Sequence, residues 1–358
     1  MKRAIKTLAH RLGFWRLAYR LRRKPILAAF TFYRVTDHAT APEYYLGYDR
    51  GLDVRDFRGQ LDAIGEYFTV IPLDEFRDIV LGQTSPREHS ALLTFDDADS
   101  EFIAHVLPAL QERNWPAVVF TPVDFVDGDK FLWHVWVGHL LRVMTEEDLE
   151  RVRSLAGLPK SVGAAIADTS PLSAERRSET ARMIVRALNG LGDNEILKVV
   201  ERIRQCCPGA SLPTIHSMDW REHKQLIQNS IAVQSHTMHH RRLAKLQRHE
   251  IAAELVDSKQ KLETQLSMPV YALCYPQGSF NDIVLEEASR AGYALGFTTR
   301  YGVCRYPIEA DSRLQLPRAG VWSGSPSDWH WSLGRLLTAP EGPSVTSPPH
   351  NHSPRSAG

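Results

Sequence analysis

Two adjacent carboxylates, Asp96 and Asp97, directly follow an apolar run that reads LLTF. Neighbouring carboxylates at a partly dry site repel each other unless a cation or hydrogen bonds compensate their charge. One carboxylate that binds a metal ion, beside one that acts as a general base, would resolve this conflict. The alternative is structural, because aspartate at the start of a helix often caps backbone N–H groups. The pair alone does not decide between catalysis and capping.

Two histidines, His236 and His240, lie four residues apart after a second apolar run. Imidazoles at this spacing on a helical turn face the same way and can share one cation with a carboxylate and water. His239 points elsewhere on a regular turn, so we exclude it. In a chain with 15 histidines the spacing alone is a weak signal. If both motifs end strands of one sheet, they converge on one face and predict a metal site with one aspartate and two histidines.

A third segment, Tyr275-Pro276-Gln277-Gly278, follows a further β-rich run. The proline and the glycine make the backbone turn, and an exposed N–H there could stabilise an oxyanion. The alternative is an ordinary loop between a strand and a helix, which we would prefer without the other two motifs.

The segments that must position these residues alternate between strand and helix patterns. Strands are expected at 26–33, 70–73, 91–95, 117–121, 231–235, 271–275 and 294–299, and helices at 54–67, from 74, and at 102–113, 250–266 and 281–291. This alternation indicates parallel βαβ units and predicts an α/β fold, either a barrel or a doubly wound sheet. In both architectures, chemistry gathers at the C-terminal ends of the strands.

The alternation stops between the expected strands at 117–121 and 231–235, where the pattern is mostly helical. Helices are expected at 146–155, 173–191 and 194–206. We interpret this region as a helical insertion at about 127–216 within a domain spanning 25–336, because no Pro/Gly/Ser-rich linker flanks it on both sides. A separate small helical domain is the alternative. Residues 337–358 are rich in Pro, Ser and Gly and predict a disordered tail.

The segment 1–24 contains nine Lys or Arg residues and no acidic residue. Apolar residues recur at three- and four-residue steps from Ile5 to Tyr19, which predicts a basic amphipathic helix. Such a helix could lie on an anionic bilayer as a peripheral membrane contact, or pack on its own domain. The charges interrupt any signal-peptide core, and no apolar run reaches the ~20 residues of a transmembrane helix. We therefore expect a cytoplasmic protein, at the inner membrane face if the helix binds lipid.

The composition excludes some classes of protein. The chain has 358 residues, 43 Lys and Arg against 42 Asp and Glu, and 43% hydrophobic residues, so neither general disorder nor a strongly basic nucleic-acid binder fits. The cysteines are too few and too irregular in spacing for a disulfide scaffold or a thiolate metal cluster. We interpret them as buried or incidental thiols: Cys206, Cys207, Cys274 and Cys304.

Five short segments occur in a characteristic order: TFDD, SHTMHH, YPQG, TTR at 298–300 and LPR at 316–318. In this order they resemble the polysaccharide deacetylases of carbohydrate esterase family 4. The resemblance extends from about Pro25 to Val321 and excludes the helical insertion. It implies a distorted (β/α) barrel and metal-dependent hydrolysis of an N-acetyl group on a sugar. The expected ion is Zn²⁺, with Co²⁺, Mn²⁺ or Ni²⁺ as alternatives.

The resemblance also implies roles for individual residues. The metal ligands would be Asp97, His236 and His240. Asp96 would be the base that activates the attacking water, and Arg318 would orient Asp96 or balance its charge. The backbone at Tyr275 would help to stabilise the oxyanion.

Two residues depart from the pattern of the family. Tyr33 in the segment FYRV stands where a histidine is expected as the general acid for the departing amine. A tyrosine with a pKa near ~10 donates a proton less readily at neutral pH than histidine does. Activity would then be reduced, or His38, His330 or water would supply the proton. Ala98 replaces the glycine that usually follows the aspartate pair, which removes a flexible residue beside the metal.

These observations predict a metal-dependent hydrolase that removes N-acetyl groups from a glycan or glycolipid precursor. One alternative is hydrolysis of another C–N amide bond at the same site, such as a formamide or a small cyclic amide. Another is a glycan-binding or assembly protein that retains the metal but has weak or lost turnover because of Tyr33. A scaffold protein without a metal would require the aspartate and histidine pairs to be unrelated.

Overall fold

The computed structural model describes residues 13–21, 25–40, 51–126, 133–167, 173–210, 216–304, 306–320 and 325–338. The chain forms two compact units, one of residues 1–35, 52–127 and 218–358 and the other of residues 36–51 and 128–217. The disordered tail that we expected at 337–358 lies outside the described residues from 339 onward. The basic helix expected over 1–24 is described only at 13–21.

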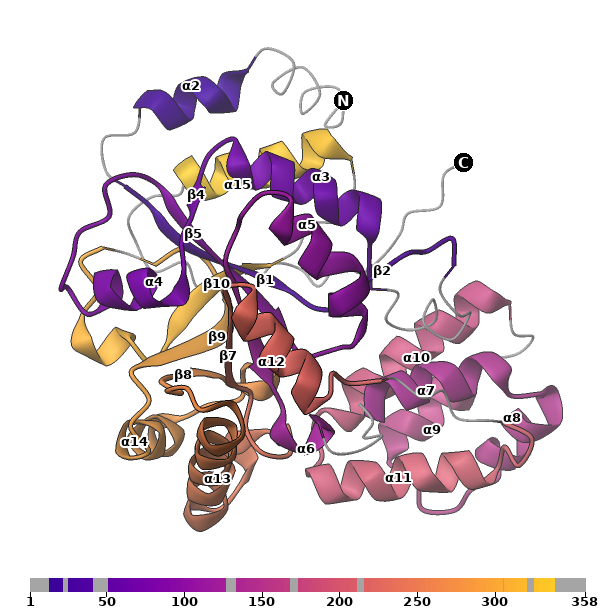
Figure 1. The fold of residues 1–358 in the computed structure, drawn as a ribbon. Coiled ribbons are helices and arrows are strands. Elements are labelled where there is room, and N and C mark those ends of the chain that lie inside the picture. Colours follow the sequence, from indigo (N-terminus) through magenta and orange to yellow (C-terminus); the bar gives the residue numbers. More distant parts are fainter. Residues whose placement is uncertain are drawn as a thin grey trace. The chain divides into compact units, whose positions relative to one another are not determined.

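The first unit is built on a barrel of parallel strands (Figure 1). Within the described residues its strands are β1 (Leu27–Phe32), β5 (Ser90–Asp96), β6 (Ala117–Thr121), β7 (Ile231–Ser235), β8 (Ala272–Cys274), β9 (Leu295–Tyr301) and β10 (Leu316–Gly320). They pair in the order β1-β10-β9-β8-β7-β6-β5, and β5 pairs again with β1. This closure confirms the predicted (β/α) barrel and excludes the doubly wound sheet.

Short strands accompany the barrel. β4 (Thr69–Val70) pairs with the first two residues of β5, while β2 (Val35–Thr36) and β3 (Leu52–Asp53) form a separate two-stranded sheet. The strand that we expected at 70–73 ends early because Pro72 is the N-cap of the next helix. The strand β10 was not predicted from its sequence, LPRAG.

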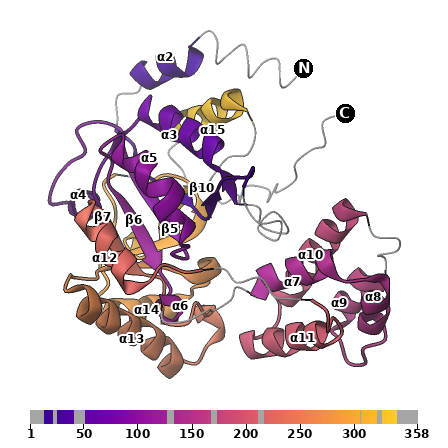
Figure 2. The same ribbon diagram turned by 45° about the vertical axis from the view of Figure 1, so that its right-hand side comes forward.

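Helices cover the outside of the barrel (Figure 2). They are α3 (Val54–Gly65), α4 (Leu73–Val80), α5 (Leu107–Gln111), α6 (Val123–Val126), α12 (Trp220–Gln228), α13 (Arg248–Leu266), α14 (Asp282–Arg290) and α15 (Pro326–Thr338). A π-helix at Phe102–Val106 leads into α5, and short 3₁₀ turns lie at Leu243–Lys245, Pro276–Gly278 and Ala310–Ser312. The capping aspartate Asp219 starts α12, a helix that periodicity had not predicted.

The alternation of residues along β5 explains how the barrel presents polar groups. Leu93 and Phe95 belong to an apolar cluster that includes residues of α3, α5 and α13, so they face the surrounding helices. Leu92 belongs to a different cluster, which joins residues of β1, β6, β9 and β10 inside the barrel. Successive residues of a strand point to opposite faces, so Asp96 lies on the inner side with Leu92. Arg318 shares the inner side with Leu316 by the same rule.

The second unit is helical. It contains α7 (Trp133–Val143), α8 (Glu146–Arg153), α9 (Lys160–Ala167), α10 (Ala174–Leu188) and α11 (Asp193–Gln205), which enclose an apolar core of their own. Three of these helices match the expected ones within a few residues, whereas α7 and α9 were not predicted. A capping box between Thr145 and Asp148 starts α8.

The N-terminal helix α2 (Phe14–Leu21) packs beside α15, as both views of the ribbon show (Figures 1 and 2). The Trp15 ring is buried and contacts Trp331 with 5.3 Å between the ring centroids. Phe14 and Leu17 remain 53% and 57% exposed. Trp15 of this helix therefore packs against its own domain, whereas Phe14 and Leu17 lie at the surface. Within the described ranges, the structure has no helix with both the length and the apolar character needed to span a bilayer.

Candidate metal and catalytic site

Asp97, His236 and His240 come together at the C-terminal ends of β5 and β7. Their ligand atoms all lie within 4.8 Å of one another. Asp97 Oδ1 is 3.6 Å from His236 Nε2 and 3.2 Å from His240 Nε2. Two imidazole nitrogens and one carboxylate oxygen form a donor set that suits Zn²⁺ and similar divalent ions and leaves positions for water and substrate.

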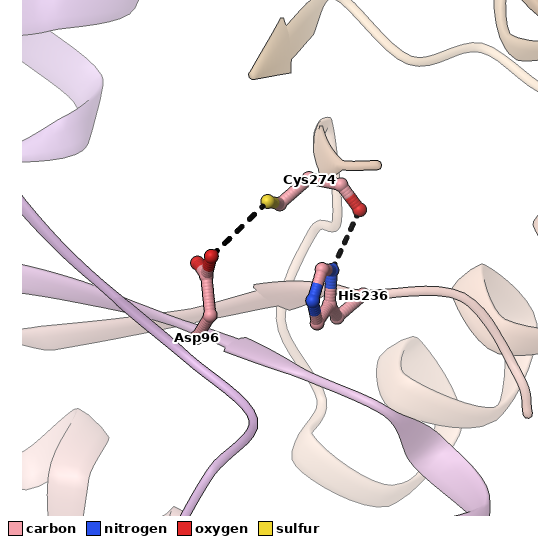
Figure 3. Close-up of side chains that lie close together, drawn as sticks. All are labelled: Asp96, His236 and Cys274. Carbon is pink, nitrogen blue, oxygen red and sulfur yellow. Dashed lines mark hydrogen bonds between the residues drawn. The ribbon is translucent and has the colours of Figure 1, made fainter. Parts of the chain in front are cut away.

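Hydrogen bonding selects the tautomer of His236. Its Nδ1 donates to the backbone carbonyl of Cys274 at 2.7 Å (Figure 3). This bond directs the proton to Nδ1 and leaves a lone pair on Nε2, the nitrogen that faces Asp97. Burial, followed by the nearby His240, lowers the pKa of His236. A neutral imidazole with a free Nε2 is the form that binds a metal ion.

Asp96 is adjacent to this cluster and forms a buried ion pair with Arg318. Arg318 Nη1 donates to Asp96 Oδ1 and Nη2 to Oδ2, both at 2.8 Å. The same guanidinium donates through Nε to the carbonyl of Thr298 and through Nη1 to Thr94 Oγ1. Burial opposes the charged form of Arg318, but the Asp96 carboxylate raises its pKa. The pair fixes both oxygens of Asp96 and compensates their charge.

The backbone around the ligands is strained. Asp97 and Ala98 have φ values of 73° and 52°, and Thr237 and His240 have φ values of 67° and 56°. These values lie in the left-handed region, which costs a non-glycine residue roughly 1–2 kcal/mol. The usual glycine at position 98 would avoid part of this cost. The histidines thus lie on an irregular loop, and our expectation that they share a regular helical turn was wrong.

The capping alternative for the aspartate pair is also wrong. Asp96 is the last residue of β5 and is buried against Arg318, and Asp97 is in the left-handed region. The helix that follows has Glu101 as its N-cap, and Asp99 Oδ1 accepts from the N–H of Glu101 at 2.9 Å.

The YPQG segment turns as its composition predicted, but Tyr275 does not offer its N–H to the site. That N–H donates to the carbonyl of Phe297 at 3.1 Å, and the Tyr275 hydroxyl donates to the carbonyl of Leu314. Both groups are occupied by the contact with β9 and the loop that follows it, so we do not retain the oxyanion role. Gly278 has a φ of 66°, and a Cβ there would collide with Thr299.

Tyr33 directly follows β1 and lines a small hollow together with Asp96 and Ala98. The residue as a whole is 45% exposed. Desolvation of the phenol, and then the charge of Asp96, raise the pKa of Tyr33 above its usual value. His330, the other candidate general acid, lies elsewhere. Its Nδ1 is 3.0 Å from the hydroxyl oxygen of Tyr67, a residue that precedes β4. His330 is therefore at the N-terminal end of the strands, and the structure excludes it as the general acid.

Cys274 is a site residue that sequence reasoning missed. Its thiol donates to Asp96 Oδ2 at 3.6 Å, and its carbonyl accepts from His236 (Figure 3). Burial raises the pKa of this thiol well above its usual value, so it stays protonated and can act as a donor. We had interpreted all four cysteines as buried or incidental; all four are free and buried. The available signal was the position of Cys274 at the end of an expected strand, directly before the YPQG segment.

Comparison with known proteins finds similarity to polysaccharide deacetylases. A family model described as polysaccharide deacetylase matches residues 83–148 and 196–296, which include both aspartates and both histidines. The putative polysaccharide deacetylase YxkH of Bacillus subtilis (strain 168) is 30% identical over 94 residues. That alignment covers 26% of this chain and 34% of YxkH, so the chain matches about a third of the length of this curated relative.

Solved structures share the fold. The deacetylase PplD of Streptococcus pyogenes, in complex with acetate, has a TM-score of 0.56 and 17% identity, covering 88% of this chain and 99% of its own. BC0361, a polysaccharide deacetylase from Bacillus cereus, has a TM-score of 0.53 and 16% identity, covering 87% of this chain and 70% of its own. Together, the comparisons confirm the resemblance: this chain is similar to polysaccharide deacetylases in part of its sequence and in its fold.

The ion pair of Asp96 and Arg318 generates a stability prediction. Arg318→Met should lower the free energy of unfolding by about 3–5 kcal/mol, because it leaves a buried carboxylate unpaired. Arg58, 37% exposed in its side chain, pairs with Glu112, 54% exposed, at the surface and provides the control. Arg58→Met should cost no more than about 1 kcal/mol. Urea unfolding measures both values, and equal losses would contradict a special contribution of the buried pair.

Proposed function

We propose that this protein is a metal-dependent hydrolase that removes N-acetyl groups from a glycan. The observation that supports this most is the cluster of Asp97, His236 and His240 beside the Asp96–Arg318 pair at one end of the barrel. Similarity to polysaccharide deacetylases supports the same reaction class, the hydrolysis of an amide bond that is not a peptide bond.

Asp97, His236 and His240 would hold a divalent ion, with Zn²⁺ as the first expectation and Co²⁺, Mn²⁺ or Ni²⁺ as alternatives. When bound, such an ion lowers the pKa of a coordinated water to about 7 and polarises the acetamide carbonyl. The neutral state of His236 and its Nε2, which faces Asp97, support this assignment. The hydrogen bond to the Cys274 carbonyl would keep the ring in its ligating orientation.

Asp96 would act as the general base. Each carboxylate oxygen has two lone pairs. Oδ2 accepts from Arg318 and from the Cys274 thiol, whereas Oδ1 accepts from Arg318 and keeps a lone pair for a further proton. Arg318 would act as a positioning residue, because its bidentate contact holds Asp96 in one orientation beside the ligands. Asp96 would take a proton from the attacking water during the addition to the carbonyl carbon.

Tyr33 would donate the proton that the departing amine requires. Its raised pKa means that the phenol remains protonated at neutral pH and is a weak acid. The same observation favours a second candidate function, a glycan-binding or assembly protein that retains the metal but turns over slowly. Hydrolysis of another C–N amide at the same site differs only in substrate, and a panel of N-acetyl, N-formyl and cyclic amides would separate these possibilities.

The segment before the barrel would mediate peripheral contact with an anionic membrane. Phe14 and Leu17 are exposed on α2, within a segment that has nine basic residues and no acidic one. Tyr19 of the same helix contacts His89, with 4.7 Å between the ring centroids, and His89 directly precedes β5. The helix thus lies at the N-terminal ends of the strands and the site at their C-terminal ends. We therefore favour a glycan that extends away from the bilayer over a glycolipid headgroup as substrate.

The roles of the base and the ligands can be separated by mutation. Asp96→Asn should retain metal but lose about 10²- to 10⁴-fold in acetate release, the typical contribution of a general base. His236→Ala should lose metal and acetate release together, because a ligand is removed. Elemental analysis and acetate release from N-acetylated oligosaccharides, with and without chelator, measure both effects. His249→Ala, at an exposed position outside the site, is the control. Equal metal loss in the Asp96 and His236 variants would refute this division of roles.

The general-acid role of Tyr33 predicts opposite effects of two substitutions. Tyr33→His should raise turnover on an activated N-acetyl substrate at neutral pH, because an imidazole titrates near ~6.5. Tyr33→Phe should lower turnover, because it removes the hydroxyl. Steady-state kinetics from about pH 6 to 9 provide the measurement. A histidine variant no faster than the parent would remove Tyr33 from the reaction.

The membrane contact predicts a loss of vesicle binding without a loss of chemistry. The double variant Phe14→Ser, Leu17→Ser should bind vesicles with anionic lipid at least about tenfold more weakly, because two exposed apolar side chains are removed. Acetate release from a soluble substrate should stay at the parental rate. Vesicles of zwitterionic lipid alone are the control. Unchanged cosedimentation with anionic vesicles would show that α2 does not contact the bilayer.

A further inference from the structure

The loop that carries the two histidines is held by a buried carboxylate from another element. Glu254 lies on α13 and is 3% exposed. Its Oε2 accepts from the backbone N–H groups of Met238 at 3.1 Å and His239 at 2.9 Å. Its Oε1 is 2.8 Å from Nδ1 of the His239 ring. One side chain therefore contacts three polar groups between His236 and His240.

The opposite side of the same loop is bound by backbone groups at the start of α6. The N–H of Val123 donates to the carbonyl of Thr237 at 3.2 Å, and that of Asp124 donates to the carbonyl of Met238 at 2.9 Å. Within the loop, Thr237 Oγ1 accepts from the N–H of His240 at 3.1 Å. The loop is thus fixed from α6 on one side and from α13 on the other.

This fixation matters because the loop conformation is costly by itself. Two of its residues, Thr237 and His240, are in the left-handed region. Such residues persist only where the surrounding structure imposes their conformation. Burying a carboxylate is also costly unless hydrogen bonds compensate its charge, and the donors of the loop supply them. Glu254 and the loop therefore depend on each other.

We propose that Glu254 is a positioning residue of the metal site. It holds the 236–240 loop in the conformation in which both Nε2 atoms face Asp97. This inference rests on the proposed function, because it assumes that the histidines bind a metal ion. It extends that function to a residue that does not contact the ion, and it assigns a purpose to His239, whose ring completes the contact with Glu254.

The test compares Glu254→Met with the parent and with a matched control. Methionine is similar in length but has no oxygen that could accept from the N–H groups of Met238 and His239. Glu263→Met makes the same change on the same helix at a site where the carboxylate binds the N–H of Val270. Co²⁺ serves as the probe, followed by its visible absorption during competition with a chelator. We expect Glu254→Met to bind Co²⁺ about 10- to 100-fold more weakly, and Glu263→Met to bind it as the parent does.

A second measurement, made on metal-free protein, keeps the two proposals distinguishable. Hydrogen exchange at the amides of Met238 and His239 should accelerate in Glu254→Met and stay unchanged in Glu263→Met. If the parent fails to bind Co²⁺, the proposed metal site is wrong, while faster exchange still supports the contact of Glu254 with the loop. If the parent binds Co²⁺ and Glu254→Met binds it equally well, the positioning role is overturned. Unchanged exchange in Glu254→Met would overturn it as well.

Discussion

Charge buried at the end of an apolar barrel is the constraint around which this structure is organised. Asp96 ends a fully buried strand, and a carboxylate in such surroundings persists only with a fixed partner. Arg318 meets this requirement from β10, a strand that lies beyond β1 in the barrel order. Its remaining donors bind Thr94 and the carbonyl of Thr298, so the guanidinium joins β5, β9 and β10 on the inside of the barrel. Closure of the barrel and compensation of the charge are therefore mutually dependent.

The same requirement explains how polar groups surround the site. The His236 ring is neutral and bonded to a carbonyl, the Cys274 thiol is protonated and bonded to Asp96, and Glu254 is bonded to the histidine loop. His236 donates its Nδ1 proton to the Cys274 carbonyl, and the Cys274 thiol donates its proton to Asp96. The loops after β5 and β7 contain residues in the left-handed region, which strains the backbone. Hydrogen bonds from α6 and α13 to the loop after β7 offset part of this strain.

Departures from the family pattern have different consequences. Ala98 accepts the left-handed conformation that a glycine would adopt freely, so this substitution affects the backbone and leaves the donor set intact. Tyr33 changes the chemistry that is available, because desolvation and then the charge of Asp96 raise the pKa of its phenol, which holds its proton more tightly than an imidazole would. Under the proposed function, the first departure leaves the ligand set unchanged and the second changes the proton donor.

The alternation of strands and helices determined the fold class, because each element is specified by local periodicity and by capping residues such as Asp219. The motif order likewise pointed to Asp96, Asp97, His236 and His240, since parallel strands bring their carboxyl ends to one face. Local sequence could not show that the Tyr275 N–H is bonded to Phe297, or that His330 lies at the other end of the barrel, because strand pairing decides both. Nor could it find Glu254, whose role arises only when α13 packs against a loop fifteen residues earlier. Contacts between distant segments decided which polar groups are occupied and which can take part in chemistry.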